Sequence, residues 1–168
     1  MIRVPLVRMG LFSRKFSPSI LRRLRGADAQ ACAAIHAAGF AYPWPASEIE
    51  ALIASASVAA VAAIDPDTQT LRGFSLARIA ADEAEILTIA VASPFRRRGI
   101  GKALLRAQFT QLAAAGVRAL FLEVDQANTP AVALYRQLAF EPVGARPGYY
   151  KRPAQTSGHA LVMKKILA

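Results

Sequence analysis

The chain has 168 residues, of which 54% are hydrophobic, and it carries a formal net charge of +10. This size and composition predict one folded domain and exclude a disordered chain, and no apolar run reaches the ~18 residues that a membrane-spanning helix needs. The excess positive charge favours polyanionic partners such as nucleic acid, ribosomes or a phosphate-bearing cofactor, but it does not choose among them.

The N-terminal segment is strongly basic. The first 26 residues contain seven arginines or lysines and no carboxylate. Such a start also occurs in targeting peptides, although a secretory signal would need an apolar segment that this one lacks. We expect residues 1–18 to be a loosely ordered basic leader and residues 19–168 to form a single domain.

Apolar runs bounded by turn residues predict seven strands, and helix-forming stretches with capping signals predict four helices. The strands are expected at residues 20–24, 58–64, 71–79, 85–91, 119–124, 142–150 and 160–167. The helices are expected at residues 27–40, from about 47, at 99–115 and at 128–138. The order β α α β β β α β α β β predicts an α/β (α+β) fold, in which helices cover the faces of a mixed sheet.

Several of these elements carry more specific signals. Ser47, with Glu50 three residues on, is the expected N-cap of the second helix. The strand at 119–124 shows almost no alternation, which predicts cover on both of its faces. Cys32 excludes an intrachain disulfide and fits the reducing cytoplasm; we expect it to be a small core residue.

A strand-to-helix junction contains the run Arg96-Arg-Arg-Gly-Ile-Gly101. A helix N-terminus presents unpaired N–H groups and a partial positive charge. Glycines let an anion approach the backbone closely, and arginines add charge-assisted hydrogen bonds to phosphate oxygens. The run therefore predicts a pyrophosphate cradle; an ordinary basic helix start and a nucleic-acid patch are the alternatives.

This run resembles the Arg/Gln-x-x-Gly-x-Gly pattern of the GNAT acetyltransferases, and the flanking residues 85–91 and 103–105 are similar to that family as well. Residues 121–140, FLEVDQANTPAVALYRQLAF, resemble the RimI-like branch, the ribosomal-protein alanine N-acetyltransferases. The resemblance implies the GNAT fold, a mostly antiparallel central sheet of about six to seven strands flanked by about four helices.

The resemblance also implies an activity. The chain is expected to be a cytoplasmic acetyl-CoA-dependent N-acetyltransferase that acts on the N-terminal α-amine of a protein, such as a ribosomal protein. A GNAT enzyme for a small-molecule amine and a non-enzymatic basic RNA-binding module are the alternatives. No metal, membrane partner or direct nucleic-acid role is expected.

The family's cofactor contacts fall on one strand, the cradle and one further residue. The backbone of residues 89–91 would pair with the pantetheine arm, and a bulge in that strand would aim an N–H at the thioester oxygen. Asn128 would contact the cofactor, or else only cap a helix. The implied cofactor-binding residues are Ile89, Ala90, Val91, Arg96, Arg97, Arg98, Gly99, Ile100, Gly101, Lys102 and Asn128.

The family assigns the catalytic roles to Glu123 and Tyr135. A carboxylate in an apolar strand suits a general base, because desolvation makes it a better proton acceptor. Tyr135 would supply a proton to the departing thiolate. The alternatives are a structural ion pair for Glu123 and a plain core position for Tyr135, and Glu85 is the rival base.

Aromatic residues are the candidates for the acceptor groove. Tyr42 and Trp44 would form one wall and Tyr149 and Tyr150 the other, unless they close the core instead.

Three more positions carry expectations. Ala139 stands where the family has a glycine, so a left-handed helix stop there would be strained. His36 is expected at the surface, and His159 in a solvated turn or as a polar contact to the substrate.

Overall fold

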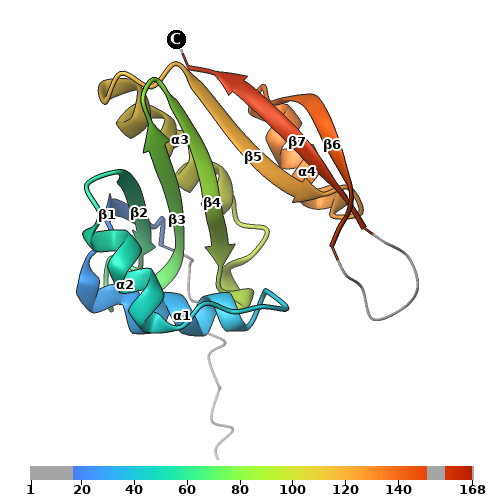
Figure 1. Ribbon diagram of the computed structural model, residues 1–168. Helices are drawn as coiled ribbons and strands as arrows, with labels where there is room; N and C mark the ends of the chain where they lie inside the picture. Colours follow the sequence, from blue (N-terminus) through green and yellow to red (C-terminus); the bar gives the residue numbers. More distant parts are fainter. Residues whose placement is uncertain (1–16, 151–157, 168) are drawn as a thin grey trace, which may run out of the picture.

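The computed structural model describes residues 17–150 and 158–167, and its centre is a single seven-stranded sheet. The strands are β1 (Ile20–Arg23), β2 (Val58–Ile64), β3 (Leu71–Ala80), β4 (Glu83–Val91), β5 (Ala119–Asp125), β6 (Glu141–Tyr150) and β7 (Gly158–Ile166). They are ordered β1-β2-β3-β4-β5-β7-β6, and β4 and β5 run parallel while the other pairs are antiparallel (Figure 1). The predicted mostly antiparallel sheet is confirmed.

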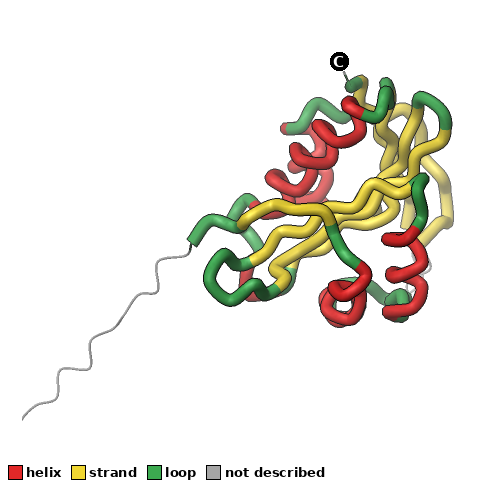
Figure 2. The backbone as a smooth tube through the Cα atoms, turned by 90° about the vertical axis from the view of Figure 1, so that its left-hand side faces the viewer, coloured by secondary structure: helices red, strands yellow, loops and turns green. Residues whose placement is uncertain are grey.

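Helices cover both faces of this sheet (Figure 2). They are α1 (Ala29–Ala37), α2 (Ala46–Ala54), α3 (Ile100–Ala114) and α4 (Thr129–Gln137), with short 3₁₀ turns at Gly26–Asp28 and Ser93–Phe95. One core cluster joins α1 and α2 to β2 and β3, and a second joins α3 and α4 to β5 and β7. The predicted order of elements is therefore confirmed.

The strand β5 differs from its prediction. Leu120, Leu122 and Val124 are buried in the core under α3 and α4. Phe121 and Glu123 point to the opposite face and are only partly buried. The strand is thus covered fully on one face, because α1 and α2 pack on β2 and β3 and do not extend over β5.

A buried polar network fixes α3 on the sheet. The Ser75 hydroxyl donates to Gln108 Oε1 at 2.6 Å, and Gln108 Nε2 donates to the Ala59 carbonyl at 3.0 Å. Gln108 shares a helix face with Leu104 and Leu112, which are fully buried. This network anchors α3 to β2 and β3, so the N-terminus of α3 has a fixed position at the end of β4.

The helix α4 ends in a left-handed residue, as the comparison with the family pattern led us to expect. Ala139 has φ +62°. The Phe140 N–H donates to the Tyr135 carbonyl and the Ala139 N–H to the Arg136 carbonyl, both at 3.0 Å. These two bonds define a Schellman motif, in which the left-handed position favours glycine.

Two local predictions were wrong. The helix α2 begins at Ala46 with Pro45 as its N-cap, so Ser47 lies within the first turn and does not cap it. His159 belongs to strand β7, not to a turn, and its side chain is exposed.

His36 corrects a third prediction, because it is buried and not at the surface. It stacks on Phe40 and Trp44, with ring centroids 4.1 and 5.0 Å apart, and its Nδ1 accepts a hydrogen bond from the Trp44 N–H at 3.2 Å. Burial lowers the pKa of His36 below its usual value, so the neutral imidazole is the form that fits this place.

Cys32 is fully buried, as predicted, and desolvation raises the pKa of its thiol to about 12. The leader predicted at residues 1–18 lies almost entirely outside the described residues. Within the described part of the chain, no helix combines the length and the apolar character that a bilayer crossing needs.

Candidate active site

The sheet opens between β4 and β5. These parallel strands are joined by three residue pairs, Glu83 with Ala119, Ala84 with Leu120 and Glu85 with Phe121. No further pair joins them within the described part of the chain, and Figure 1 shows them diverging. From Ile86 onward, the edge of β4 that faces β5 therefore has backbone groups available to an extended ligand.

A β-bulge lies in β4 just beyond the point of divergence. Leu76 of β3 pairs with Thr88, but its neighbour Ala77 pairs with Ile86, so Leu87 is an extra residue in β4. A bulge re-aims the groups around it. The resemblance to the family implied a bulge in this strand, and the structure has one.

The arginine- and glycine-rich loop leads into α3 as predicted. Gly99 is the N-cap residue with φ +77°, and Arg97 is also left-handed with φ +61°. The Arg96 Nε donates to the Val91 carbonyl at 3.0 Å and ties the loop to the end of β4. The three arginines at 96–98 are exposed next to the N-terminus of α3. This arrangement is suited to binding a pyrophosphate.

A cavity of about 530 Å³ lies between this loop and α4. Of the predicted cofactor-binding residues, seven line it: Val91, Arg96, Arg97, Gly99, Ile100, Gly101 and Lys102. A Cβ on Gly101 would lie 3.6 Å from Leu134 Cδ2 and 3.9 Å from Ile89 Cδ1. The glycine therefore keeps open a gap between β4 and α4, at the place where a side chain would enter the cavity.

The other predicted cofactor residues do not line that cavity. Ile89 packs in the core on the α3 side, and Ala90 is buried on the opposite face. Arg98 is exposed. Asn128 is the N-cap of α4, and its Oδ1 accepts the Ala131 N–H at 3.3 Å.

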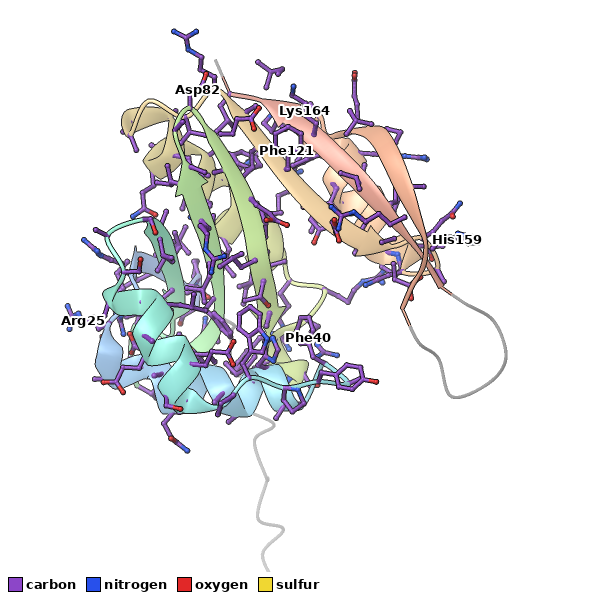
Figure 3. The ribbon with its side chains drawn as sticks, viewed as in Figure 1. Arg25, Phe40, Asp82, Phe121, His159 and Lys164 are labelled. Carbon is purple, nitrogen blue, oxygen red and sulfur yellow. The ribbon has the colours of Figure 1, made fainter. Side chains whose placement is uncertain are left out.

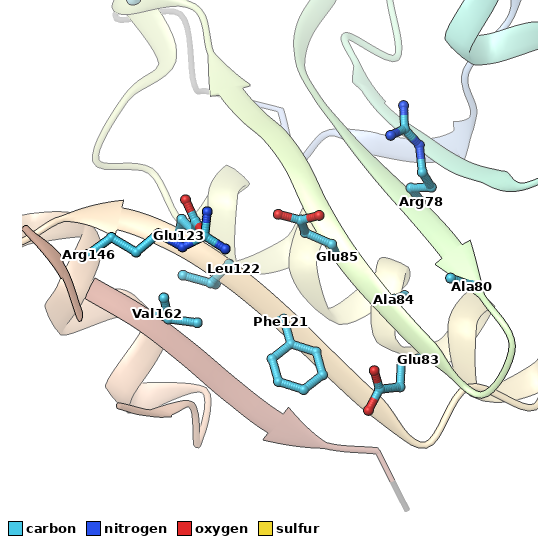
Figure 4. Close-up of a pocket in the computed structure, with 10 residues that line it drawn as sticks. All are labelled: Arg78, Ala80, Glu83, Ala84, Glu85, Phe121, Leu122, Glu123, Arg146 and Val162. Carbon is cyan, nitrogen blue, oxygen red and sulfur yellow. The ribbon is translucent and has the colours of Figure 1, made fainter. Parts of the chain in front are cut away.

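Glu123 faces a second cavity, of about 310 Å³, on the face of β5 opposite to α4 (Figure 4). Its carboxylate is 15% exposed, and its Oε1 lies 3.1 Å from the Nε of Arg146 on β6. Glu83 and Glu85 line the same cavity from β4. Glu123 therefore forms the ion pair that was the alternative to a catalytic role, but its carboxylate also borders the cavity.

Tyr135 lies on the other side of the sheet from Glu123. Its ring is buried on α4 and meets Phe140 edge to face at 5.8 Å. Leu122 of β5 belongs to the same core cluster. Tyr135 is thus part of the core on the α4 side, and it lines neither of the two cavities.

Two of the four aromatic residues predicted for the acceptor groove can be placed by their side chains. Tyr42 is 77% exposed, and Trp44 is half-buried against the core under α1 and α2. Neither lines the two cavities described above. The side chains of Tyr149 and Tyr150 lie outside the described part of the structure.

Sequence reasoning missed three contributors to the site. A Cβ on Gly73 of β3 would lie 2.8 Å from the Ala90 carbonyl oxygen, so only glycine lets β4 run close to β3 there. A glycine inside a strand is a recognisable signal of close backbone approach. Arg146 and Leu134 reach the site from β6 and α4 and gave no local signal.

The chemistry open to this arrangement is limited by its groups. Among the described residues, no three His, Cys, Asp or Glu side chains gather as a metal site would require. The cradle can bind a phosphate-bearing molecule, the free edge of β4 can hold an extended arm, and Glu123 can accept a proton from a group in the second cavity.

A sheet opened in this way, with a phosphate cradle at the opening, defines the GNAT class of α/β proteins. The chain belongs to the acetyltransferase (GNAT) family, whose profile it matches over residues 29–140. It is 37% identical over 140 residues to the N-alpha-acetyltransferase RimI of Mycobacterium tuberculosis, a match that covers 80% of this chain and 85% of that one.

Two further similarities concern the ribosomal protein bS18-alanine N-acetyltransferases. The Salmonella typhimurium protein is 38% identical over 93 residues, 55% of this chain. The crystal structure of the Escherichia coli enzyme has a TM-score of 0.81 at 26% identity and covers 89% of this chain and 94% of that chain. The chain spans 62% of the Salmonella protein's length and 37% of that of an uncharacterized Mycobacterium leprae protein.

Proposed function

We propose that the protein is a cytoplasmic N-acetyltransferase that moves the acetyl group of acetyl-CoA to the N-terminal α-amine of a protein, with ribosomal proteins as the acceptor class. One observation carries the proposal: the opening between β4 and β5 has a phosphate cradle on the α3 side and the Glu123 carboxylate on the other. The names of the RimI and bS18-alanine relatives support the choice of acceptor.

The basic residues that line the first cavity suit the phosphates of acetyl-CoA. Residues 96–102 would hold its pyrophosphate through exposed guanidinium groups and the free N–H groups of α3. The pantetheine arm would pair with the backbone of residues 89–91, and Asn128 would contact it in addition to capping α4. The bulge at Leu87 lies next to this segment, where an N–H could stabilise the thioester oxygen.

The reaction needs one group to take a proton and one to give a proton. Glu123 accepts a proton from the acceptor ammonium, and the neutral nitrogen then attacks the thioester carbonyl. A C–N bond forms, the C–S bond breaks, and the thiolate takes the proton of the Tyr135 hydroxyl. The nitrogen loses its second proton, which restores the Tyr135 hydroxyl through solvent, and Glu123 releases the first proton. The net change turns ammonium and thioester into amide, free thiol and one proton released to solvent.

The positions of Glu123 and Tyr135 agree with these separate roles. They lie on opposite faces of β5, so the amine would enter on the side of Glu123 and the sulfur would leave on the side of α4. On the amine side, Tyr42 and Trp44 would form one wall of the groove and Tyr149 and Tyr150 the other.

The test compares acceptors that differ only in which amine is free. A peptide with a small, uncharged first residue is expected to be acetylated, because an α-amine has a pKa near 7.7–8.0 while a lysine amine is near 10.4. Both peptides contain an internal lysine, and the one whose α-amine is masked should not react. Equal rates for the two peptides, measured by thiol release and mass spectrometry, would exclude an N-terminal acetyltransferase and leave a broader amine acetyltransferase.

A further inference from the structure

Arg146 reaches Glu123 across an intervening strand. Its partner on β7 is Ala160, and Ala160 in turn pairs with Asp125 of β5. The side chain therefore extends from β6 past β7 to bring its Nε within 3.1 Å of Glu123 Oε1. Two strand spacings amount to about 10 Å, a distance that favours the longest basic side chain.

The ion pair has an asymmetric setting. The Glu123 side chain is 15% exposed and that of Arg146 62%. Both side chains line the cavity (Figure 4), and the carboxylate is largely shielded from solvent while most of the Arg146 side chain is exposed. Truncating Arg146 would consequently remove little packing, whereas its charge acts on a largely desolvated partner.

Five other charged residues lie on the same side of the sheet as Glu123. Glu83 and Glu85 of β4 and Arg78 of β3 line the cavity with Glu123. Asp125 lies two residues beyond Glu123 on β5 and so shares its face. Lys164 of β7 lies beside Phe121, with its Nζ 5.2 Å from the ring centroid (Figure 3). The contact between Arg146 and Glu123 thus lies within a cluster of mixed charge on this face.

We infer that Arg146 is a positioning residue for catalysis: it holds the Glu123 carboxylate in place at the wall of the acceptor cavity. This inference rests on the proposed N-acetyltransferase function, in which Glu123 accepts the proton of the acceptor ammonium. An ionised carboxylate can accept about four hydrogen bonds, so contact with Arg146 leaves room for the amine. Without the guanidinium, the Glu123 side chain can rotate away from the amine, and proton transfer slows.

The experiment measures kcat and the KM values for peptide and acetyl-CoA. Arg146→Gln should lower kcat about three- to tenfold, because a displaced base is less effective. The KM for acetyl-CoA should not change, because Arg146 does not line the cavity at the cradle. Arg146→Lys keeps the charge with a shorter reach and should restore part of the rate.

Two controls separate the local effect from a general one. Arg118→Gln removes the same charge from an exposed position outside both cavities and should leave kcat unchanged. In a Glu123→Gln background, Arg146→Gln should have no further effect on kcat, because its action passes through Glu123.

The outcomes are distinct. An inactive wild-type protein would overturn the proposed function itself. If the wild type is active and Arg146→Gln leaves kcat unchanged, or lowers it as much in the Glu123→Gln background, the positioning role alone is overturned. Melting curves of the variants, expected to coincide with the wild type, identify any loss of rate that comes from misfolding.

Discussion

Replacing Ala139 by glycine tests the C-terminal cap of α4. Ala139 is held at φ +62° by the two hydrogen bonds of the Schellman motif. A left-handed conformation costs an L-residue about 1–2 kcal/mol. Glycine escapes this cost but loses about 0.5–1 kcal/mol more conformational entropy on folding. The net expectation is a gain of about 0.5–1 kcal/mol, or roughly 1–4 °C in Tm for a chain of this size.

The assay is reversible thermal or urea unfolding, with a second alanine as control. Ala113→Gly makes the same chemical change at an exposed right-handed position near the end of α3. It should destabilise the protein by about 0.5–1 kcal/mol, because glycine is a poor helix residue. Opposite signs for the two substitutions are expected. If Ala139→Gly lowers Tm as Ala113→Gly does, the left-handed cap is not the conformation in solution.

Three other substitutions address the site and its support. Glu123→Gln and Tyr135→Phe should each slow acetyl transfer, the former by about 10²–10⁴-fold, while calorimetry shows CoA binding little changed. Gly101→Val should sharply weaken CoA binding with circular dichroism unchanged, because its side chain would enter the first cavity; unaltered affinity would remove the cradle from the proposed site. His36 is buried with a lowered pKa, so the unfolded state binds the extra proton first and the free energy of unfolding should fall as pH drops below about 6.5. In His36→Asn, urea titrations at pH 5–8 should show a weaker pH dependence of the free energy of unfolding. An unchanged pH dependence would contradict the lowered pKa of His36.

Features with a local cause were predictable from the sequence. The hairpin of β2 and β3 follows from two apolar runs around a proline-containing turn. The cradle was identified because glycines and arginines at a strand-to-helix junction have a direct physical meaning. The strained cap at Ala139 was found because one residue differed from the family pattern.

Features that depend on distant packing could not be predicted. His36 is surrounded by alanines in the sequence, and its burial comes from Phe40 and Trp44 beyond the end of its helix. Arg146 contacts Glu123 across β7, which lies between their strands, and the local sequence gives no sign of this strand order. The full cover expected for β5 failed for a similar reason, since apolar runs do not reveal where a neighbouring helix ends.

Because β4 and β5 diverge, part of β4 has an unpaired edge although it lies in the middle of the sheet. An ordinary edge strand is an aggregation hazard, because any other chain can pair with it. The free edge of β4 is instead flanked by β5 and by the helices, so a second sheet cannot approach it. The unpaired backbone N–H and C=O groups of β4 can therefore be reached only by a narrow, extended molecule. The geometry of the backbone thus selects for the shape of the ligand before any side chain contributes to recognition.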